Sequence, residues 1–227
     1  MQRAILYMLV LLGLLTTAVR AELISGPMIA HLEMREAKIW IQTDEPTLVR
    51  VAYANADDPN ALHWTIPEET DSKQAHIALV TLDKIEPGLN YSYRVELNGE
   101  IVTSPARFSS PANYHGRTPP PDFKVAVGGA HYVIEEGFEP PYQLLGGGYN
   151  IFSAISESQP ALMIWAGNTA HLRKSDWSTQ SGYLKRYNKA RSVPQLQPLL
   201  QSIPHYATWG EKDFGAPNGG MNSAYRE

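Results

Sequence analysis

Three consecutive prolines, Pro119 to Pro121, divide the chain into two parts whose apolar residues follow different periods. Before the prolines, residues 24–110 contain short segments in which apolar and polar residues alternate, as strands do. After them, from residue 123, short apolar runs that end in glycine alternate with segments of helical spacing. Successive prolines resist both helix and sheet, so residues 113–122 are interpreted as a stiff linker. The sequence therefore predicts two domains, at 22–112 and 123–227.

The first domain is predicted to be an all-β sandwich of the immunoglobulin or fibronectin-III type. Turn residues separate the strands expected at 37–43, 47–54, 75–83 and 91–100. Leu82, Pro87-Gly88 and Tyr91 are arranged like the tyrosine corner of such sandwiches. We expect the Tyr91 ring to be buried and its hydroxyl to bond the backbone at the corner.

The second domain is predicted to be α/β. Buried strands are expected at 123–130, at 161–168 and from His205, and helices at 149–158, 179–192 and 193–202. This alternation predicts a parallel sheet with right-handed crossovers. Ligands gather outside the carboxyl ends of such strands, which here are residues 128–131, 167–169 and 210–213.

The first 21 residues read as a secretory signal peptide. Arg3 precedes an apolar run over residues 4–15, and cleavage is expected after Ala21. A retained anchor is the alternative, but the run is shorter than the roughly 20 residues of a spanning helix. A secreted or periplasmic protein with no membrane span after cleavage is therefore expected. The 227 residues carry a formal net charge of -4 and no cysteine, which predicts no disulfides and argues against nucleic-acid binding.

The chain resembles the PhoD-like alkaline phosphatases, a branch of the binuclear metallophosphatases. The resemblance rests on residues 25–43, 82–99, 141–155, 161–200 and 205–215. It implies a sandwich followed by the first part of an α/β metallophosphatase domain, and hydrolysis of phosphate mono- or diesters outside the cytoplasm with iron and calcium. Such chemistry holds two metals about 4 Å apart around a hydroxide.

The strand-end motifs depart from the family's pattern. Ala130 stands where the family has a cysteine, Asn168 replaces the metal-bridging aspartate, and Lys212 replaces a histidine. Alanine has no donor atom, an amide cannot bridge as an anion, and an ammonium repels cations. The expected remnants are Asn168 and Lys212 among catalytic positions, and Ala130, Asn168, Glu211 and Asp213 among metal positions. No cofactor is therefore expected in this chain, which we interpret as a truncated pseudoenzyme.

Two alternatives stay open. An active hydrolase could use a rebuilt site with Asn168, Glu211, Asp213, His131 and His171, while Lys212 and Arg173 hold the phosphate. The substrate-binding candidates are then Arg173, His131 and His171, whereas His205 is expected to pack structurally. The second alternative is an extracytoplasmic binding module that presents exposed aromatics such as Trp64 and Tyr53.

The last expectation concerns the edge of the parallel sheet. The chain ends at Glu227, before the strands that carry the family's remaining ligands. Three parallel strands leave an open edge and partly exposed apolar faces. We expect a further protein segment or a protein partner to cover this edge, and a phosphate ester to be a partner only if the site is active.

Overall fold

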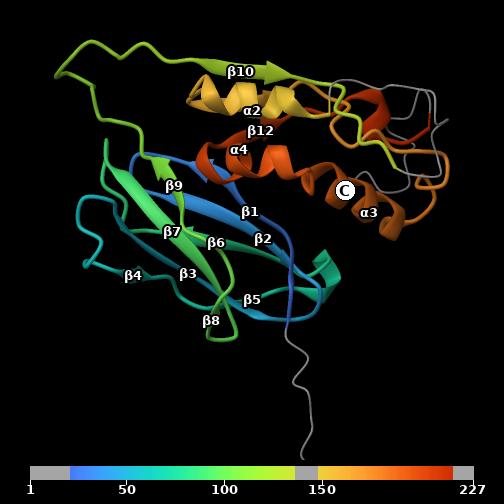
Figure 1. The fold of residues 1–227 in the computed structure, drawn as a ribbon, viewed down its shortest axis with the longest axis horizontal. Helices are drawn as coiled ribbons and strands as arrows, with labels where there is room; N and C mark the ends of the chain where they lie inside the picture. The colour runs from blue at the N-terminus through green and yellow to red at the C-terminus, as the bar shows by residue number, and fades with distance from the viewer. Residues whose placement is uncertain (1–20, 136–147, 217–227) are drawn as a thin grey trace, which may run out of the picture.

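The structure is a computed structural model that describes residues 21–135 and 148–216. Two antiparallel sheets share one core in the first part of the chain (Figure 1). One sheet contains β1 (Leu23–Leu32), β2 (Ala37–Thr43) and β6 (Ile77–Leu82). The other contains β3 (Leu48–Asn55), β4 (His63–Trp64), β5 (Glu68–Glu69), β7 (Asn90–Leu97), β8 (Glu100–Ile101) and β9 (Ala106–Ser109). A short 3₁₀ turn, η1 (Ser72–Gln74), precedes β6.

The core forms because alternate side chains along each strand point to the same face. Ile39 and Ile41 of β2 are fully buried against Val49 and Val51 of β3, and Trp40 lies on the opposite face of β2. The predicted alternation in these strands is confirmed.

The two aromatics expected at the sandwich surface have different environments. Trp64 is 41% exposed, and the Arg50 guanidinium lies 4.1 Å from the centre of its ring. The expectation that Tyr53 is exposed is wrong: it is 1% exposed, and its hydroxyl lies 3.3 Å from Asp83 Oδ1 and 3.1 Å from the backbone nitrogen of Lys84. Residue 53 lies on the same inward face of β3 as Val49 and Val51, so the Tyr53 ring is part of the core.

The tyrosine corner is confirmed. Tyr91 is buried, and its hydroxyl accepts a hydrogen bond of 2.8 Å from the backbone nitrogen of Glu86. Its ring stacks on Phe108 at 5.4 Å between centroids. The corner therefore ties the turn before β7 to the core.

Replacing Tyr91 by phenylalanine is expected to lower the free energy of unfolding by about 1 kcal/mol, because it leaves the Glu86 amide without its partner. Urea unfolding followed by fluorescence measures the change. Tyr114→Phe, at an exposed position in the linker, is the matched control and is expected to leave the midpoint unchanged. Equal midpoints for both variants would contradict a structural role for the corner hydrogen bond.

The second part of the chain contains the predicted alternation of strands and helices. β10 (Val125–Gly128), β11 (Leu162–Trp165) and β12 (His205–Ala207) pair in parallel in that order. α2 (Asn150–Glu157) connects β10 to β11, and α3 (Gln180–Arg191), η2 (Pro194–Leu196) and α4 (Gln197–Ser202) connect β11 to β12. The segment 193–202 starts as a 3₁₀ turn because Pro194 and Pro198 lie in its first turns.

The parallel sheet is covered on one face only by the described residues. Met163 is buried on the covered side, whereas Val127 and Ile164, which are paired in register on the other side, are 65% and 38% exposed. The expectation of fully buried strands is therefore wrong for this face, and the expectation of partly exposed apolar faces is confirmed. Coverage of the sheet edge by a further segment or partner stays a prediction.

The two parts of the chain contact each other through α4 and the start of the sandwich. Figure 1 shows α4 beside β1 and β9, which it contacts. The Tyr93 hydroxyl of β7 donates a 2.9 Å hydrogen bond to the carbonyl oxygen of Gln201. Met28 of β1 packs on a cluster that includes Leu196 and Leu200. The helices that frame the parallel sheet are thus fixed against the sandwich.

The predicted signal peptide lies outside the described residues, apart from Ala21. Within residues 21–135 and 148–216, no helix combines the length and the apolar character required to cross a bilayer.

Candidate functional site

The three predicted strand ends do meet at one edge of the parallel sheet. The Ala166 amide donates to the carbonyl oxygen of Gly128 at 2.7 Å, and the Ala130 amide donates to that of Gly167 at 3.0 Å. A Cβ added to Gly167 would lie 2.8 Å from the Cα of Gly210. The loops after β10, β11 and β12 are thus packed backbone to backbone.

Asp213, an expected remnant of a metal site, is enclosed by hydrogen-bond donors. Its Oδ1 accepts from the Ala170 amide at 3.0 Å and from Thr169 Oγ1 at 3.3 Å. Its Oδ2 accepts from the amides of Asn168 and Gly210, at 2.5 and 2.9 Å. The residue is 1% exposed. Its carboxylate therefore connects the loop after β11 to η3 (Glu211–Asp213), and its oxygens are already occupied.

Asn168, which was expected to replace a bridging aspartate, connects the same two loops in the opposite direction. Its Oδ1 accepts a hydrogen bond of 2.7 Å from the Lys212 amide. Its backbone φ of 56° lies in the left-handed region, which asparagine tolerates better than most residues. The missing Cβ of Gly210 makes room for it, since a Cβ there would lie 2.6 Å from Asn168 Oδ1.

The residues at the strand ends do not fit iron or calcium. Ala130 offers no donor atom, and the side-chain oxygens that Asn168 and Asp213 offer already accept backbone hydrogen bonds. Lys212 adds a positive charge that would repel a multivalent cation. Glu211 is exposed on η3. No group of three or more histidine, cysteine or acidic residues that could hold a metal occurs among the described residues.

Arg173, expected to hold phosphate, belongs to an ion-pair network. Its Nη1 lies 3.2 Å from Glu135 Oε2, and its Nη2 donates to the Tyr132 hydroxyl at 3.1 Å. Arg186 joins Glu135 at 3.0 Å and Asp176 at 2.9 Å. The network thus connects α3 to the loops after β10 and β11. Asp176 was not among the predicted site residues, although it lies within residues 161–200, which carry part of the resemblance.

His131 and His171 occupy different surroundings. His131 is buried, donates to the carbonyl oxygen of Ala190 at 3.0 Å and packs edge-on against Phe152. His171 lies edge-on to Tyr132 at 4.8 Å between ring centroids. Burial lowers the pKa of both histidines, and the charge of Lys212 lowers the pKa of His171 further.

His205 packs structurally, as expected. Its Nδ1 accepts from Trp165 Nε1 at 3.0 Å, and its Nε2 donates to the carbonyl oxygen of Leu199 at 3.1 Å. Burial lowers its pKa from 6.5 to about 4, because the charged form loses its hydration. His205 is therefore neutral at pH 7.

This neutral histidine predicts a loss of stability in acid. Between pH 6.5 and about pH 4, His205 is protonated in the unfolded chain but stays neutral in the folded chain. The free energy of unfolding therefore falls as the pH is lowered through this range. We expect His205 to contribute about 2 kcal/mol to this fall, less than the full shift implies because the ring is half-buried. Urea unfolding between pH 7 and pH 4 measures it.

His205→Gln cannot titrate and keeps an acceptor for Trp165. This variant is expected to lose about 2 kcal/mol less of its free energy of unfolding between pH 7 and pH 4 than the wild type does. A matched His115→Gln variant, at an exposed linker position, should leave the slope unchanged. Identical slopes for wild type and His205→Gln would show that the histidine is not held neutral by burial.

Comparison with known proteins places this arrangement in a known fold. Residues 20–115 match the family described as a domain of unknown function (DUF7800). No curated protein matches the sequence significantly. The structure of PhoD superposes on 82% of this chain with a TM-score of 0.62 and 14% identity. The chain has a PhoD-like fold.

A second solved structure shares this fold. Purple acid phosphatase PPD1 from yellow lupin (Lupinus luteus) seeds matches 82% of this chain with a TM-score of 0.58 and 14% identity. The chain spans 38% of the length of PhoD and 34% of that of PPD1. The resemblance to PhoD-like phosphatases is thereby confirmed for the fold. At 14% identity, the chemistry has to be argued from the residues of this chain.

Proposed function

We propose that this chain is an extracytoplasmic relative of PhoD-like phosphatases whose strand-end site no longer hydrolyses phosphate esters. In this proposal residues 22–112 form an immunoglobulin-like or fibronectin-III-like sandwich, and residues 123–227 correspond to part of an α/β metallophosphatase domain. The observation that carries the proposal is the enclosure of Asp213 by three backbone amides and the Thr169 hydroxyl.

The enclosure matters because a metal ligand must offer a lone pair to the ion. Each Asp213 oxygen accepts two hydrogen bonds, and the side chain is almost completely buried. Binding a metal would require these bonds to break and would leave amides of two loops unpaired. Asn168 is constrained in the same way by the Lys212 amide. These two residues therefore hold the strand-end loops together, which is a structural role.

The rebuilt hydrolase is less well supported by the geometry. His131 packs among aromatic rings and donates to a helix carbonyl, and Arg173 is committed to Glu135 and Tyr132. Among the contacts of the described residues, none brings His131 or Arg173 together with Asn168 and Asp213 around one binding site. His171, the third candidate, lies against the same Tyr132 side chain as Arg173, whereas His131 packs elsewhere against Phe152.

A hydrolysis assay tests the proposal. The purified full chain is incubated with 4-nitrophenyl phosphate and bis(4-nitrophenyl) phosphate, with and without added iron and calcium, and its metal content is measured. We expect no turnover above the buffer and no stoichiometric iron. Metal-dependent turnover that disappears in Glu211→Ala and persists in Glu69→Ala, an exposed glutamate of the sandwich, would overturn it.

A further inference from the structure

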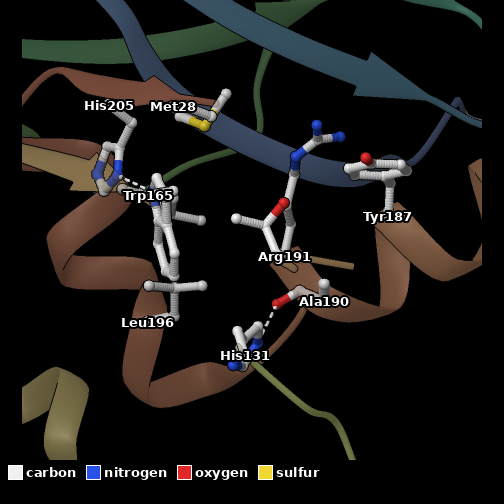
Figure 2. A pocket seen from close by; sticks show the side chains of 11 residues that line it. Met28, His131, Trp165, Tyr187, Ala190, Arg191, Leu196 and His205 are labelled. Atoms are coloured by element: carbon white, nitrogen blue, oxygen red, sulfur yellow. Dashed lines mark hydrogen bonds between the residues drawn. The ribbon is translucent and has the colours of Figure 1, made fainter. Parts of the chain in front are cut away.

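A cleft of about 140 Å³ lies between the parallel sheet, the helices α3 and α4, and strand β1 of the sandwich. Figure 2 shows Trp165 and His205 on one side of it and Arg191 with Tyr187 on the other. Its lining is mostly apolar, with Met28, Trp165, Leu196 and Leu200. A cavity of about 150 Å³ with such a lining can hold one benzene ring. The cleft thus has room for a ligand of that size.

Arg191 is the one charged side chain among the described residues that line this cleft. The rings of Trp40 and Tyr187 lie 4.7 and 5.4 Å from its guanidinium carbon and hold the group in place. Within the described chain, no carboxylate forms an ion pair with Arg191 and its guanidinium donates no hydrogen bond. Other internal arginines differ: Arg173 and Arg186 both have carboxylate partners.

The remaining polar groups of the cleft do not neutralise this charge. Burial lowers the pKa of His131 and His205, and each donates its Nε2 proton to a backbone carbonyl. Desolvation likewise lowers the pKa of Arg191, whose side chain is half-buried. A cation in such surroundings is stabilised most by an anion that brings its own apolar surface into the cleft.

We propose that the cleft binds a small organic carboxylate whose apolar body packs against Trp165 and Leu196 and whose carboxylate accepts hydrogen bonds from Arg191. The planar guanidinium presents paired donors that match the two carboxylate oxygens. Ala207 lines the cleft and is exposed, so a ligand can enter on that side. The cleft extends to the strand-end loops, since His131 and Thr169 also line it. The proposed binding uses Arg191 and Trp165 and does not require hydrolysis at those loops.

Isothermal titration of the full chain with benzoate tests the proposal. Benzamide, a neutral molecule of the same shape, and inorganic phosphate, an anion without an apolar body, are the comparison ligands. We expect benzoate to bind, and benzamide and phosphate to bind at least about tenfold more weakly, because each lacks one half of the required chemistry. Absence of benzoate binding, or equal binding of either comparison ligand, would overturn the proposal.

Arg191→Met removes the charge and keeps an apolar stem against Trp40 and Tyr187. It is expected to weaken benzoate binding by about tenfold or more. Lys189→Met removes the same charge from an exposed position of α3 and is expected to leave binding unchanged. Equal losses in both variants would show that only the general charge of α3 matters and would contradict a site at Arg191.

A measurement on the unaltered chain keeps the proposal testable if Arg191→Met does not fold. Benzoate is titrated into the chain and followed by nuclear magnetic resonance. We expect the indole N–H signal of Trp165, which lines the cleft, to shift as benzoate binds. The indole signal of Trp64, on the outer face of the sandwich, should stay in place. A shift of Trp64 without a shift of Trp165 would place the ligand elsewhere.

Discussion

Gly210→Ala is expected to lower the free energy of unfolding by about 3 kcal/mol. A Cβ at this position would lie 2.5 Å from the backbone nitrogen of Asn168 and 2.6 Å from its Oδ1. Carbon atoms do not approach backbone at these distances, so the loops after β11 and β12 would have to separate. Separation would strain the hydrogen bonds from Asn168 and Gly210 to Asp213.

Urea unfolding of the full chain measures this effect, and Gly128→Ala is the matched control. A Cβ at Gly128 would meet only the terminal carbon of Met163, at 3.1 Å, and a flexible side chain can move aside. We expect the control to change the free energy of unfolding by less than about 1 kcal/mol. Similar losses in the two variants would mean that the loops are not in close contact at Gly210.

The same contact limits which residues position 210 can hold. Any side chain there would collide with Asn168 as it is now placed. The glycine at 210 and the asparagine at 168 are therefore coupled through space. We expect Gly210→Asp to be at least as destabilising as Gly210→Ala.

Much of the fold could be predicted because it follows from local patterns. Alternation in residues 37–43 placed Ile39 and Ile41 in the core, and the spacing of Leu82, Pro87 and Tyr91 predicted the corner. The order of strands and helices after residue 123 predicted a parallel sheet whose strand ends meet. Each of these features depends on residues that are close in sequence or on a general rule of chain topology.

The roles of the site residues depend on contacts that no local pattern contains. The sequence predicts Asp213 as the remnant of a metal site, and only the folded loops show that amides from residues 168, 170 and 210 surround it. Tyr53 has apolar neighbours on both sides, so alternation did not reveal which face it occupies. Arg191 was not predicted as a binding residue. What distinguishes it is that no carboxylate among the described residues pairs with it, and the sequence alone does not show this.

Asp213→Ala is expected to have the largest effect of the substitutions considered, a loss of about 4 kcal/mol in the free energy of unfolding. The change removes a buried acceptor of four hydrogen bonds and leaves the amides of Asn168, Ala170 and Gly210 without partners. Hydrogen bonds to a charged group contribute about 1.5–3 kcal/mol each, and their contributions are not additive. Urea unfolding and near-ultraviolet circular dichroism measure the loss.

Two further variants separate a structural carboxylate from a catalytic one. Asp213→Asn keeps one acceptor oxygen and replaces the other with an amide donor, so we expect about half of the loss seen with alanine. Glu211→Ala changes an exposed neighbour on the same turn and should alter stability by no more than about 0.5 kcal/mol. A carboxylate kept for metal chemistry would behave differently, because its removal relieves charge repulsion and often leaves stability unchanged or improved. If Asp213→Ala unfolds at the same urea concentration as the wild type, Asp213 is not the residue that holds these loops together.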